Sequence, residues 1–392
     1  MSSALQARID ELSLAIERQK QVLLDLEKSR SHARCELNAI LDPMARLPVE
    51  ISSDIFVWCL PDSPRPHSGQ APLLFLRICH RWSDIAIATP TLWTSISCPS
   101  LADGADLDIW LQRAGDLPLS ISLHGSLHSS AAVAVEQYAH RLRDMMLQPR
   151  HLEQLAIQFP SLATLRVLGL PDDRTGGREC LDIMRKAPAL TKCDLNPIRW
   201  FRNAPPTPLT HHSLRRLRLR GLNCSSSVLK YLTLPALERL HISDLNLTTG
   251  ELAAFFVRSS PPLLSLRVEG LDDEDLRESL RLVPNVTDLS MKFPEPTIDP
   301  LMVLLEDLGP NRELLPNLRN LCIEDCFNHD VDYEAVIDAL VARRVAPQSR
   351  LQSFKLITQN PEPHPDSIAA LRKFAEESGM QIHVGTSRYN YI

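Results

Sequence analysis

The sequence predicts an α/β chain in which a curved parallel sheet with outer helices follows a small all-helical unit and a long N-terminal helix. Three observations support this prediction. An apolar frame recurs from residue 162 onward, two amphipathic segments flank a proline-rich loop, and a heptad pattern fills the first forty residues. The predicted boundaries are 1–42 for the N-terminal helix, 45–95 for the helical unit, 96–160 for degenerate linking or capping repeats, and 161–385 for the repeats.

The repeat frame reads apolar-x-x-apolar-x-apolar, and successive frames start 23 to 33 residues apart. The frames start at Leu162, Leu190, Leu214, Leu237, Leu263, Val286, Leu318 and Leu351. These spacings lie within or near the range of about 20 to 29 residues that is typical of leucine-rich repeats, in which each repeat contributes one strand. The sequence therefore predicts a leucine-rich-repeat solenoid with a parallel strand at each frame.

Helix-like segments lie between most of the frames. They cover residues 227–232, 251–260, 273–283, 299–308, 333–345 and 366–379. Because neighbouring parallel strands need a crossover connection, these segments fit the outer helices of the solenoid. Two earlier segments, near 118–126 and at 140–147, are predicted to form degenerate strands that cap or start the stack.

The N-terminal segment carries a seam of residues in alternating steps of four and three. The seam positions are Leu5, Ile9, Leu12, Ile16, Gln19, Leu23, Leu26, Arg30, Ala33, Leu37 and Ile40. A mainly apolar seam with charged flanks favours a coiled coil, and through it a homodimer. The alternative is a single amphipathic helix that folds back on the next unit, because Gln19, Arg30 and Ala33 weaken the seam. Proline disfavours helical geometry in the residue before it, so Asp42–Pro43 should end the helix.

The helical unit contains two amphipathic segments joined by the loop PDSPRPHSGQAP. The first segment begins after Pro48, which suits the first turn of a helix, and carries an apolar stripe at Ile51, Ile55, Phe56, Cys59 and Leu60. The second segment carries a similar stripe at Leu74, Ile78, Trp82 and Ile85. A unit of about 50 residues is close to the lower limit for a self-sufficient apolar core, so we expect it to need a partner surface.

Three motifs follow one another in this unit: Leu47-Pro48-x-Glu50-Ile51 with Ile55-Phe56, then Leu74-x-Leu76-x-Ile78-Cys79-x-x-Trp82, then Leu92-Trp93. With these motifs, the segment resembles an F-box in the form common among mushroom-forming fungi. The resemblance covers about 50 of the 392 residues. One departure is the loop from Pro61 to Pro72, which is longer and richer in proline than the usual tight connector.

The resemblance implies that the unit docks on the Skp adaptor and, through it, on a cullin. The residues it implies for this adaptor surface are Leu47, Pro48, Ile51, Ile55, Phe56, Leu60, Leu74, Leu76, Ile78, Cys79 and Trp82. It also implies the function, which is that of a substrate-recognition subunit of a Skp-cullin-F-box E3 ubiquitin ligase whose repeats hold a target protein. The alternative is a non-catalytic interaction scaffold that acts outside ubiquitination.

Composition argues for a protein partner. The formal net charge of −6 argues against a general binder of nucleic acid or anionic membranes, which usually carries a net basic face. No apolar run approaches the roughly 18 residues that span a bilayer, and the N-terminus has no apolar signal region. Nine cysteines without paired spacing fit a reducing compartment. The sequence therefore predicts an intracellular protein, in the cytoplasm, the nucleus or both.

No pattern in the sequence predicts catalysis. Cys322-x-x-x-Cys326-x-x-His329 offers only three nearby ligands for zinc, and Asp272–Asp275 lacks the spacing of a calcium loop and suits a helix start. The pair His211–His212 has no carboxylate or thiol at motif spacing, which is typical of a loop. The glycines form no phosphate-binding motif. We therefore expect no enzyme activity, metal or cofactor.

A basic segment, SLRRLRLRGL over 213–222, is the candidate target-binding surface. Strand alternation places its arginines on the open face of the sheet, and the repeat frame places further basic residues beside them. The candidate residues are Arg216, Arg218, Arg220, Arg239, His241 and Arg267. Six donors so close together should repel one another unless an acidic or phosphorylated protein segment lies across them. The alternative is ordinary solvated strand positions balanced by Asp194 and Glu269. RNA ranks third, because no aromatic residues interleave to stack bases.

Overall fold

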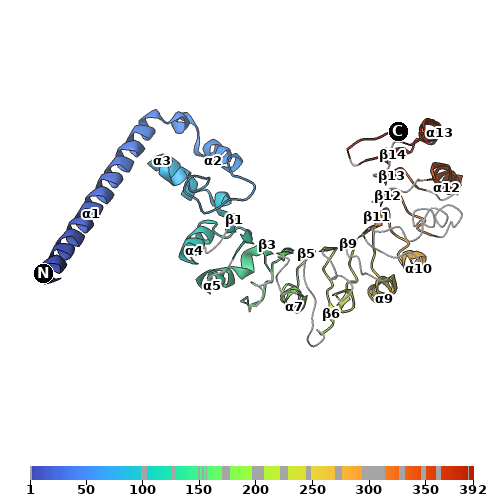
Figure 1. Ribbon diagram of the computed structural model, residues 1–392, viewed down its shortest axis with the longest axis horizontal. Coiled ribbons are helices and arrows are strands. Elements are labelled where there is room, and N and C mark those ends of the chain that lie inside the picture. The colour runs from blue at the N-terminus through green and yellow to red at the C-terminus, as the bar shows by residue number, and fades with distance from the viewer. Residues whose placement is uncertain are drawn as a thin grey trace. The chain divides into compact units, whose positions relative to one another are not determined.

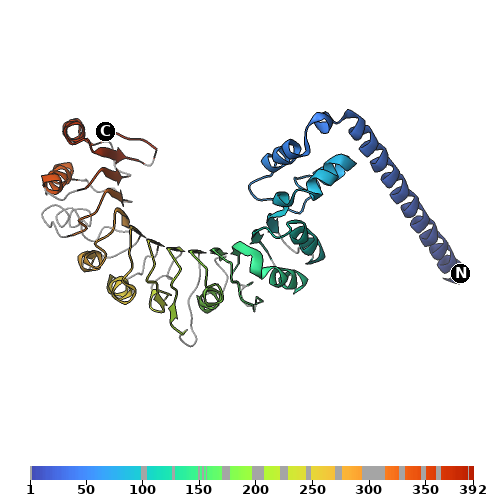
Figure 2. The ribbon, with the colours of Figure 1, turned by 180° about the vertical axis from the view of Figure 1, so that it is seen from behind.

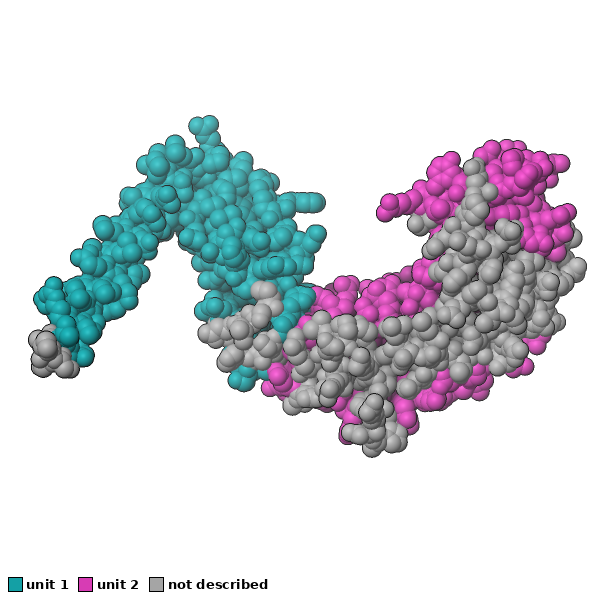
Figure 3. All heavy atoms as spheres, viewed as in Figure 1, with its two compact units in different colours: residues 1–134 teal, residues 135–392 magenta. Residues whose placement is uncertain are grey.

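A computed structural model of the chain describes most of its length (Figure 1). The described residues are 2–98, 104–125, 129–148, 151, 154–155, 157–169, 177–196, 207–220, 228–243, 249–269, 276–293, 314–325, 332–345, 350–358, 363–386 and 388–392. The chain divides into two compact units, residues 1–134 and 135–392, which Figure 3 colours separately. Among the described helices, none is both long and apolar enough to cross a membrane.

The first unit is mainly helical. Its helices are α1 (Ser2–Leu41), η1 (Pro43–Arg46), α2 (Val49–Trp58), η2 (Phe75–Arg77), α3 (His80–Ile87), η3 (Pro90–Trp93) and α4 (Gly104–Arg113), and α5 (Ser129–Gln137) spans the unit boundary. Two parallel strands, β1 (Ser95–Cys98) and β2 (Leu119–Leu123), follow the helical segment with Ser95 opposite Ser120. The strand predicted near 118–126 is therefore confirmed.

Helix α1 ends where the sequence predicts. Asp42 caps the following turn, because its Oδ1 accepts hydrogen bonds from the Met44 amide at 2.9 Å and from Trp82 Nε1 at 2.8 Å. The last turns of α1 contact the helical segment through Asn38, whose Nδ2 donates to the Ile78 carbonyl at 2.8 Å. Every described seam residue of α1 is exposed, and the exposed fractions of its leucines and isoleucines run from 49% at Leu12 to 81% at Ile40. Fold-back contacts are thus confined to the end of α1, and the seam is free for a partner.

An aromatic cluster forms the core of the helical segment. Phe56 of α2 stacks on Phe75 with ring centroids 4.2 Å apart, and Trp82 of α3 lies 4.9 Å from Phe56. The prediction of one continuous stripe over 74–85 is wrong. Residues 75–77 form the 3-10 turn η2, and Cys79 is extended (φ −158, ψ 170) before α3 begins. This break lets Phe75, rather than Leu74, turn inward against Phe56.

A second buried pair of rings links the helical segment to α4. Trp93 and Trp110 make an edge contact with centroids 5.1 Å apart, and Trp93 Nε1 donates to the Ala86 carbonyl at 2.8 Å. Arg113 of α4 covers the Trp93 ring at 4.5 Å in a cation–π contact. These tryptophans are core residues, whereas Trp58 is 89% exposed.

The second unit is a parallel sheet backed by helices. Its strands are β3 (Leu142–Leu147), β4 (Thr164–Leu168), β5 (Lys192–Asn196), β7 (Arg216–Arg220), β9 (Arg239–Ser243), β10 (Ser265–Glu269), β11 (Asp288–Phe293), β12 (Asn320–Asp325), β13 (Ser353–Ile357) and β14 (Gln381–Gly385), which neighbour one another in that order. With β1 and β2, this sheet has twelve strands among the described residues, and they follow one another in chain order. The strand predicted at 140–147 is confirmed as β3.

Helices cover one side of this sheet in both views of the ribbon (Figures 1 and 2). They are α7 (Gly177–Lys186), α9 (Thr249–Ser259), α10 (Leu276–Arg281), α12 (Tyr333–Val345) and α13 (Pro365–Ser378). The predicted helices over 251–260, 333–345 and 366–379 are confirmed. The segment 227–232 is helical only in part: Val228 and Leu229 are helical, whereas Leu232–Thr233 form the short strand β8, which pairs with β6 (Leu209–Thr210). The predicted helix over 299–308 and the acidic cluster Asp272–Asp275 lie outside the described residues.

The apolar frame sets the strand positions. All eight predicted frames are followed, two residues after their start, by a strand of the sheet. The first apolar position is buried in seven of the eight frames, as at Leu190 and Leu214, which are 0% exposed. Burial of each such side chain contributes about 1.5–3 kcal/mol, so stacked repeats share one continuous core. The frame misses β14 because Gly379, in the left-handed conformation at φ 68, occupies the leucine position while it ends α13.

Candidate functional site

Helix α2 exposes an apolar face in the first unit. Ile51, Ile55 and Trp58 follow at i, i+4 and i+7 and therefore share one side of the helix. Their exposed fractions are 47%, 38% and 89%. Ser52 and Phe56 lie around the helix from them, and both are buried. We call Ile51, Ile55 and Trp58 the α2 face. The core of the unit therefore forms on the other side, which leaves this face available to a partner.

The predicted adaptor residues are not equivalent in this structure. Pro48, Ile51, Ile55 and Leu74 are exposed. Five others are half-buried: Leu47, Leu60, Leu76, Ile78 and Trp82. Phe56 and Cys79 are 1% and 2% exposed and belong to the core, so they can support a docking surface but do not form one here. Sequence reasoning missed Trp58, although its spacing of three and seven residues from Ile55 and Ile51 was the available signal.

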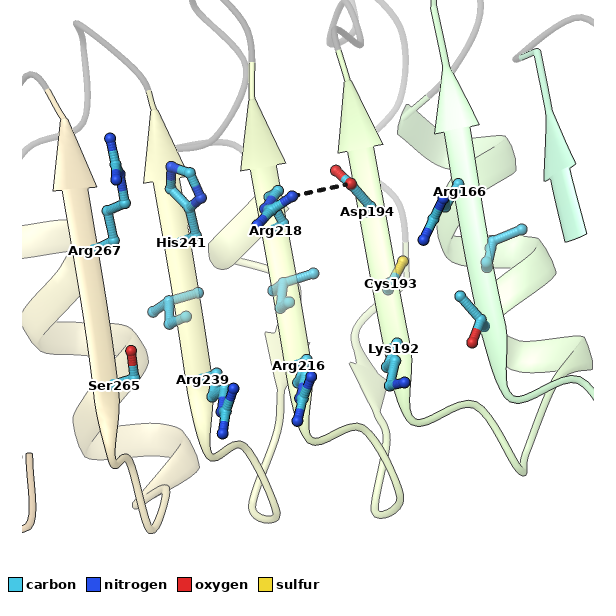
Figure 4. A pocket seen from close by; sticks show the side chains of 14 residues that line it. Arg166, Lys192, Cys193, Asp194, Arg216, Arg218, Arg239, His241, Ser265 and Arg267 are labelled. Carbon is cyan, nitrogen blue, oxygen red and sulfur yellow. Dashed lines mark ion pairs between the residues drawn. The ribbon is translucent and has the colours of Figure 1, made fainter. Parts of the chain in front are cut away.

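In the second unit, the register of the sheet places polar side chains in rows across the strands. The first row contains Lys192, Arg216, Arg239 and Ser265, on β5, β7, β9 and β10 (Figure 4). The middle row contains Asp194, Arg218, His241 and Arg267 on the same strands. The next row includes Arg220, Ser243 and Glu269. The prediction that the repeat frame places further basic residues beside Arg216 and Arg218 is confirmed, because Arg239 lies opposite Arg216 and His241 lies opposite Arg218.

Carboxylates from neighbouring strands pair with most of the middle and last rows. Asp194 Oδ2 lies 3.6 Å from Arg218 Nη1 and 3.2 Å from Arg220 Nη2. Arg267 is held between Glu269 at 2.9 Å and Glu324 at 3.1 Å. The expected mutual repulsion of these arginines therefore does not arise, because the sheet places a carboxylate beside each of them. The balanced alternative describes this part of the surface.

His241 adds little positive charge. Its Nε2 lies 3.2 Å from Glu269 Oε1. Burial is the largest influence on the imidazole and lowers the pKa of His241, although Glu269 favours its protonation. Burial also favours the neutral form of Glu269, but hydrogen bonds from Ser243, Arg267 and His241 outweigh it and lower the pKa of that carboxyl. The network is therefore one half-buried carboxylate that accepts hydrogen bonds from three donors.

The first row differs from the other two. Lys192, Arg216 and Arg239 are exposed, and so is Arg166, which lies opposite Asp194 on β4. Within the part of the chain that the structure describes, none of these four side chains makes a hydrogen bond or an ion pair. Sequence reasoning included Arg216 and Arg239 but missed Arg166 as a candidate. The uncompensated charge on this surface thus lies in the first row and at Arg166, which extends the middle row onto β4.

These residues line one pocket. Its volume is about 300 Å³, and its walls come from β4, β5, β7, β9 and β10. Six lining side chains are cationic and one is a carboxylate, Asp194; the cations are Arg166, Lys192, Arg216, Arg218, Arg239 and Arg267. Arg220 does not line it. We call this site the basic pocket, and Figure 4 shows how its side chains rise from adjacent strands.

Other candidate groups have structural positions. His211 is 4% exposed, and its Nε2 lies 3.0 Å from the Ala187 carbonyl, so it joins neighbouring repeats rather than forming part of an open loop. Burial lowers its pKa. Among the described residues, no group of three His, Cys, Asp or Glu side chains is placed to hold a metal ion. Cys326 and His329 lie outside the described residues.

Comparison with known proteins adds no family assignment: no family model matches the chain, and no curated protein matches it. The function is therefore inferred from the fold, the α2 face and the basic pocket.

Proposed function

We propose that the protein is a non-catalytic substrate receptor of a Skp-cullin-F-box ubiquitin ligase. In this proposal, the helical segment is an F-box that docks on the Skp adaptor, and the second unit is a leucine-rich-repeat solenoid that holds the target. The observation that carries the proposal is the α2 face, which exposes two isoleucines and a tryptophan within the segment that resembles an F-box. Exposed apolar patches of this kind mark interaction surfaces, and tryptophan is a frequent anchor of binding energy.

Catalysis in such a complex is by proximity. The receptor raises the effective concentration of the target beside a ubiquitin-conjugating enzyme and contributes no reacting group. The second unit suits this role, because a parallel sheet backed by helices offers a long surface of strand side chains to a protein segment. The described surface carries the basic pocket, which gives this sheet a site for an acidic ligand.

The test is a matched pair of substitutions on α2. Ile55 and Val57 are both 38% exposed, but they lie on opposite sides of the helix. Ile55→Asp should abolish capture of the Skp adaptor, because an unpaired carboxylate buried in an interface costs several kcal/mol, enough to lose a micromolar complex. Val57→Asp should leave capture unchanged. Replacing Leu47–Pro48 with Ala–Ala should weaken capture as Ile55→Asp does.

Circular dichroism of each variant should show unchanged helix content and melting. If Ile55→Asp captures the adaptor as well as Val57→Asp does, the F-box assignment is wrong.

A second candidate is an interaction scaffold outside ubiquitination, and the exposed seam of α1 favours it. Leu12, Ile16 and Leu23 are 49%, 54% and 58% exposed, so α1 can assemble with a second copy of itself. Co-purification separates the two functions. A receptor should bring down both the adaptor and a cullin, whereas a scaffold should bring down the adaptor alone.

A further inference from the structure

The first row of the sheet contains five consecutive hydrogen-bond donors, with an aspartate on the strand beyond each end. From β4 to β10 it reads Thr164, Lys192, Arg216, Arg239 and Ser265. Beyond these, the same row places Asp144 on β3 and Asp288 on β11. Neighbouring strands lie about 4.8 Å apart, so the three cations span roughly 10 Å and the whole donor run roughly 19 Å. The row therefore accepts a compact anion and repels a long polyanion at both ends.

The chemistry of these side chains matches a phosphate monoester. Such a group carries about −1.5 to −2 charges at pH 7 and three acceptor oxygens, so it can receive a bond from each of three neighbouring cations. A single carboxylate has one charge and two acceptor atoms, which would leave part of the row unpaired. Arginine guanidinium groups also bind phosphate in bidentate fashion. Lys192, Arg216 and Arg239 are not committed to any carboxylate within the described residues, so binding breaks no ion pair.

The surroundings favour a phosphorylated protein over a nucleic acid. The pocket of about 300 Å³ has no Phe, Tyr or Trp in its described lining, so it offers no surface on which bases could stack. The acidic residues that bound the row would also repel the next phosphates of a nucleotide chain. An extended peptide can bring a single phosphate into the pocket without placing further phosphates against the acidic ends of the row.

We propose that the basic pocket binds a phosphoserine or phosphothreonine of an extended protein segment, with the phosphate held by Lys192, Arg216 and Arg239. This proposal rests on the proposed function, because it takes the second unit as the surface that holds the target. Ser265 and Thr164 supply hydroxyl donors at the two ends of the row, and Arg166, opposite Asp194 on β4, adds a fourth cation in the neighbouring row. Arg218 and Arg267 remain with their carboxylates and contribute less.

The experiment uses the full chain and three immobilised peptide libraries. One is centred on phosphoserine, one on unmodified serine, and one on a Glu-Glu pair in the same degenerate flanks. The chain should be retained by the phosphoserine library at least tenfold more than by either of the others, and added salt should reduce this retention. The double variant Arg216→Glu, Arg239→Glu should lose the retention.

The matched control reverses two other exposed arginines of the same unit, Arg281→Glu and Arg319→Glu, which lie outside the pocket lining. This control has the same net charge and should retain the phosphoserine library. Equal retention on the Glu-Glu library would overturn the assignment to phosphate. Preferential displacement of bound phosphopeptide by single-stranded RNA would overturn the assignment to protein.

Capture of the Skp adaptor is measured in the same preparations. Loss of phosphopeptide binding by the control, or no binding by the unaltered chain, would overturn the pocket proposal even if the adaptor is captured. Failure to capture the adaptor, with phosphopeptide binding intact, would instead overturn the proposed ligase function and leave the pocket in place. The two failures are therefore distinguishable.

Discussion

The two candidate surfaces differ in how their exposed side chains relate to the interior. On α2, the apolar stripe predicted from helical spacing divides, with Phe56 packed in the core and Ile55, one residue away, on the surface. On the sheet, strand alternation predicts the exposed side correctly at every position of β7. The difference follows from geometry, because a strand has two faces and a helix surface is continuous. Periodicity therefore assigns burial on a strand more securely than on a short helix.

The largest expected effect is a difference in stability between substitutions on the buried and the exposed side of α2. Phe56→Ala removes a fully buried ring that stacks on Phe75 and contacts Trp82, so it should lower the free energy of unfolding by about 3–5 kcal/mol. Trp58→Ala removes a larger side chain that is 89% exposed and should change stability by less than about 0.5 kcal/mol. Chemical denaturation measures both. Similar losses in the two variants would mean that Trp58 is part of the core.

The exposed seam of α1 extends this comparison to a second helix. If α1 pairs with a second copy, deletion of residues 1–40 should halve the mass measured by light scattering and leave adaptor capture unchanged. Leu12→Asp with Ile16→Asp should have the same effect within an intact chain, because both seam residues would be charged. A full-length monomer at tens of micromolar would contradict the dimer.

A substitution at one carboxylate, Asp194, tests whether ion pairing keeps the arginines of the sheet from binding a ligand. Asp194→Asn releases Arg218 and Arg220 from their shared partner and leaves a neutral side chain of the same size. Because an exposed ion pair is worth about 0.2–1 kcal/mol, affinity for a phosphoserine peptide should rise roughly two- to fivefold. Fluorescence anisotropy with a labelled peptide measures the change. Lower affinity would show that Asp194 positions Arg218 for the ligand.

The smallest effect concerns two histidines of the second unit. Burial lowers the pKa of His211 and of His241, so the unfolded chain takes up their protons first as the pH falls below about 6.5. The contribution of these histidines to stability is therefore present above pH 6.5 and lost on acidification. His211→Gln keeps a donor toward the Ala187 carbonyl and does not titrate. Between pH 7.5 and pH 5, the free energy of unfolding of this variant should fall less than that of the unaltered chain. An equal fall would show that His211 does not contribute to the pH dependence of stability.

Local chemistry and repetition along the chain are enough to place several elements of the fold. The proline after Asp42 predicts the end of α1. The apolar frame predicts the positions of eight strands. Because strand side chains alternate between two faces, the same frame also predicts which side chains of each strand are buried. It also brought Arg216 beside Arg239, since the same frame position recurs in adjacent repeats. Such features follow from spacing alone.

Which side chains have partners depends instead on how the elements pack in three dimensions. The break at Cys79 put Phe75 into the aromatic core and left Leu74 outside, because core packing depends on how two segments meet across a loop. Likewise, the pairing of Arg267 with Glu324 joins residues that lie 57 positions apart in the chain and on strands separated by β11. Lys192, Arg216 and Arg239 keep an unpaired charge because, within the described residues, none of them has a carboxylate partner of this kind. Electrostatic balance depends on distances of a few ångströms between strands, which one-dimensional spacing does not supply.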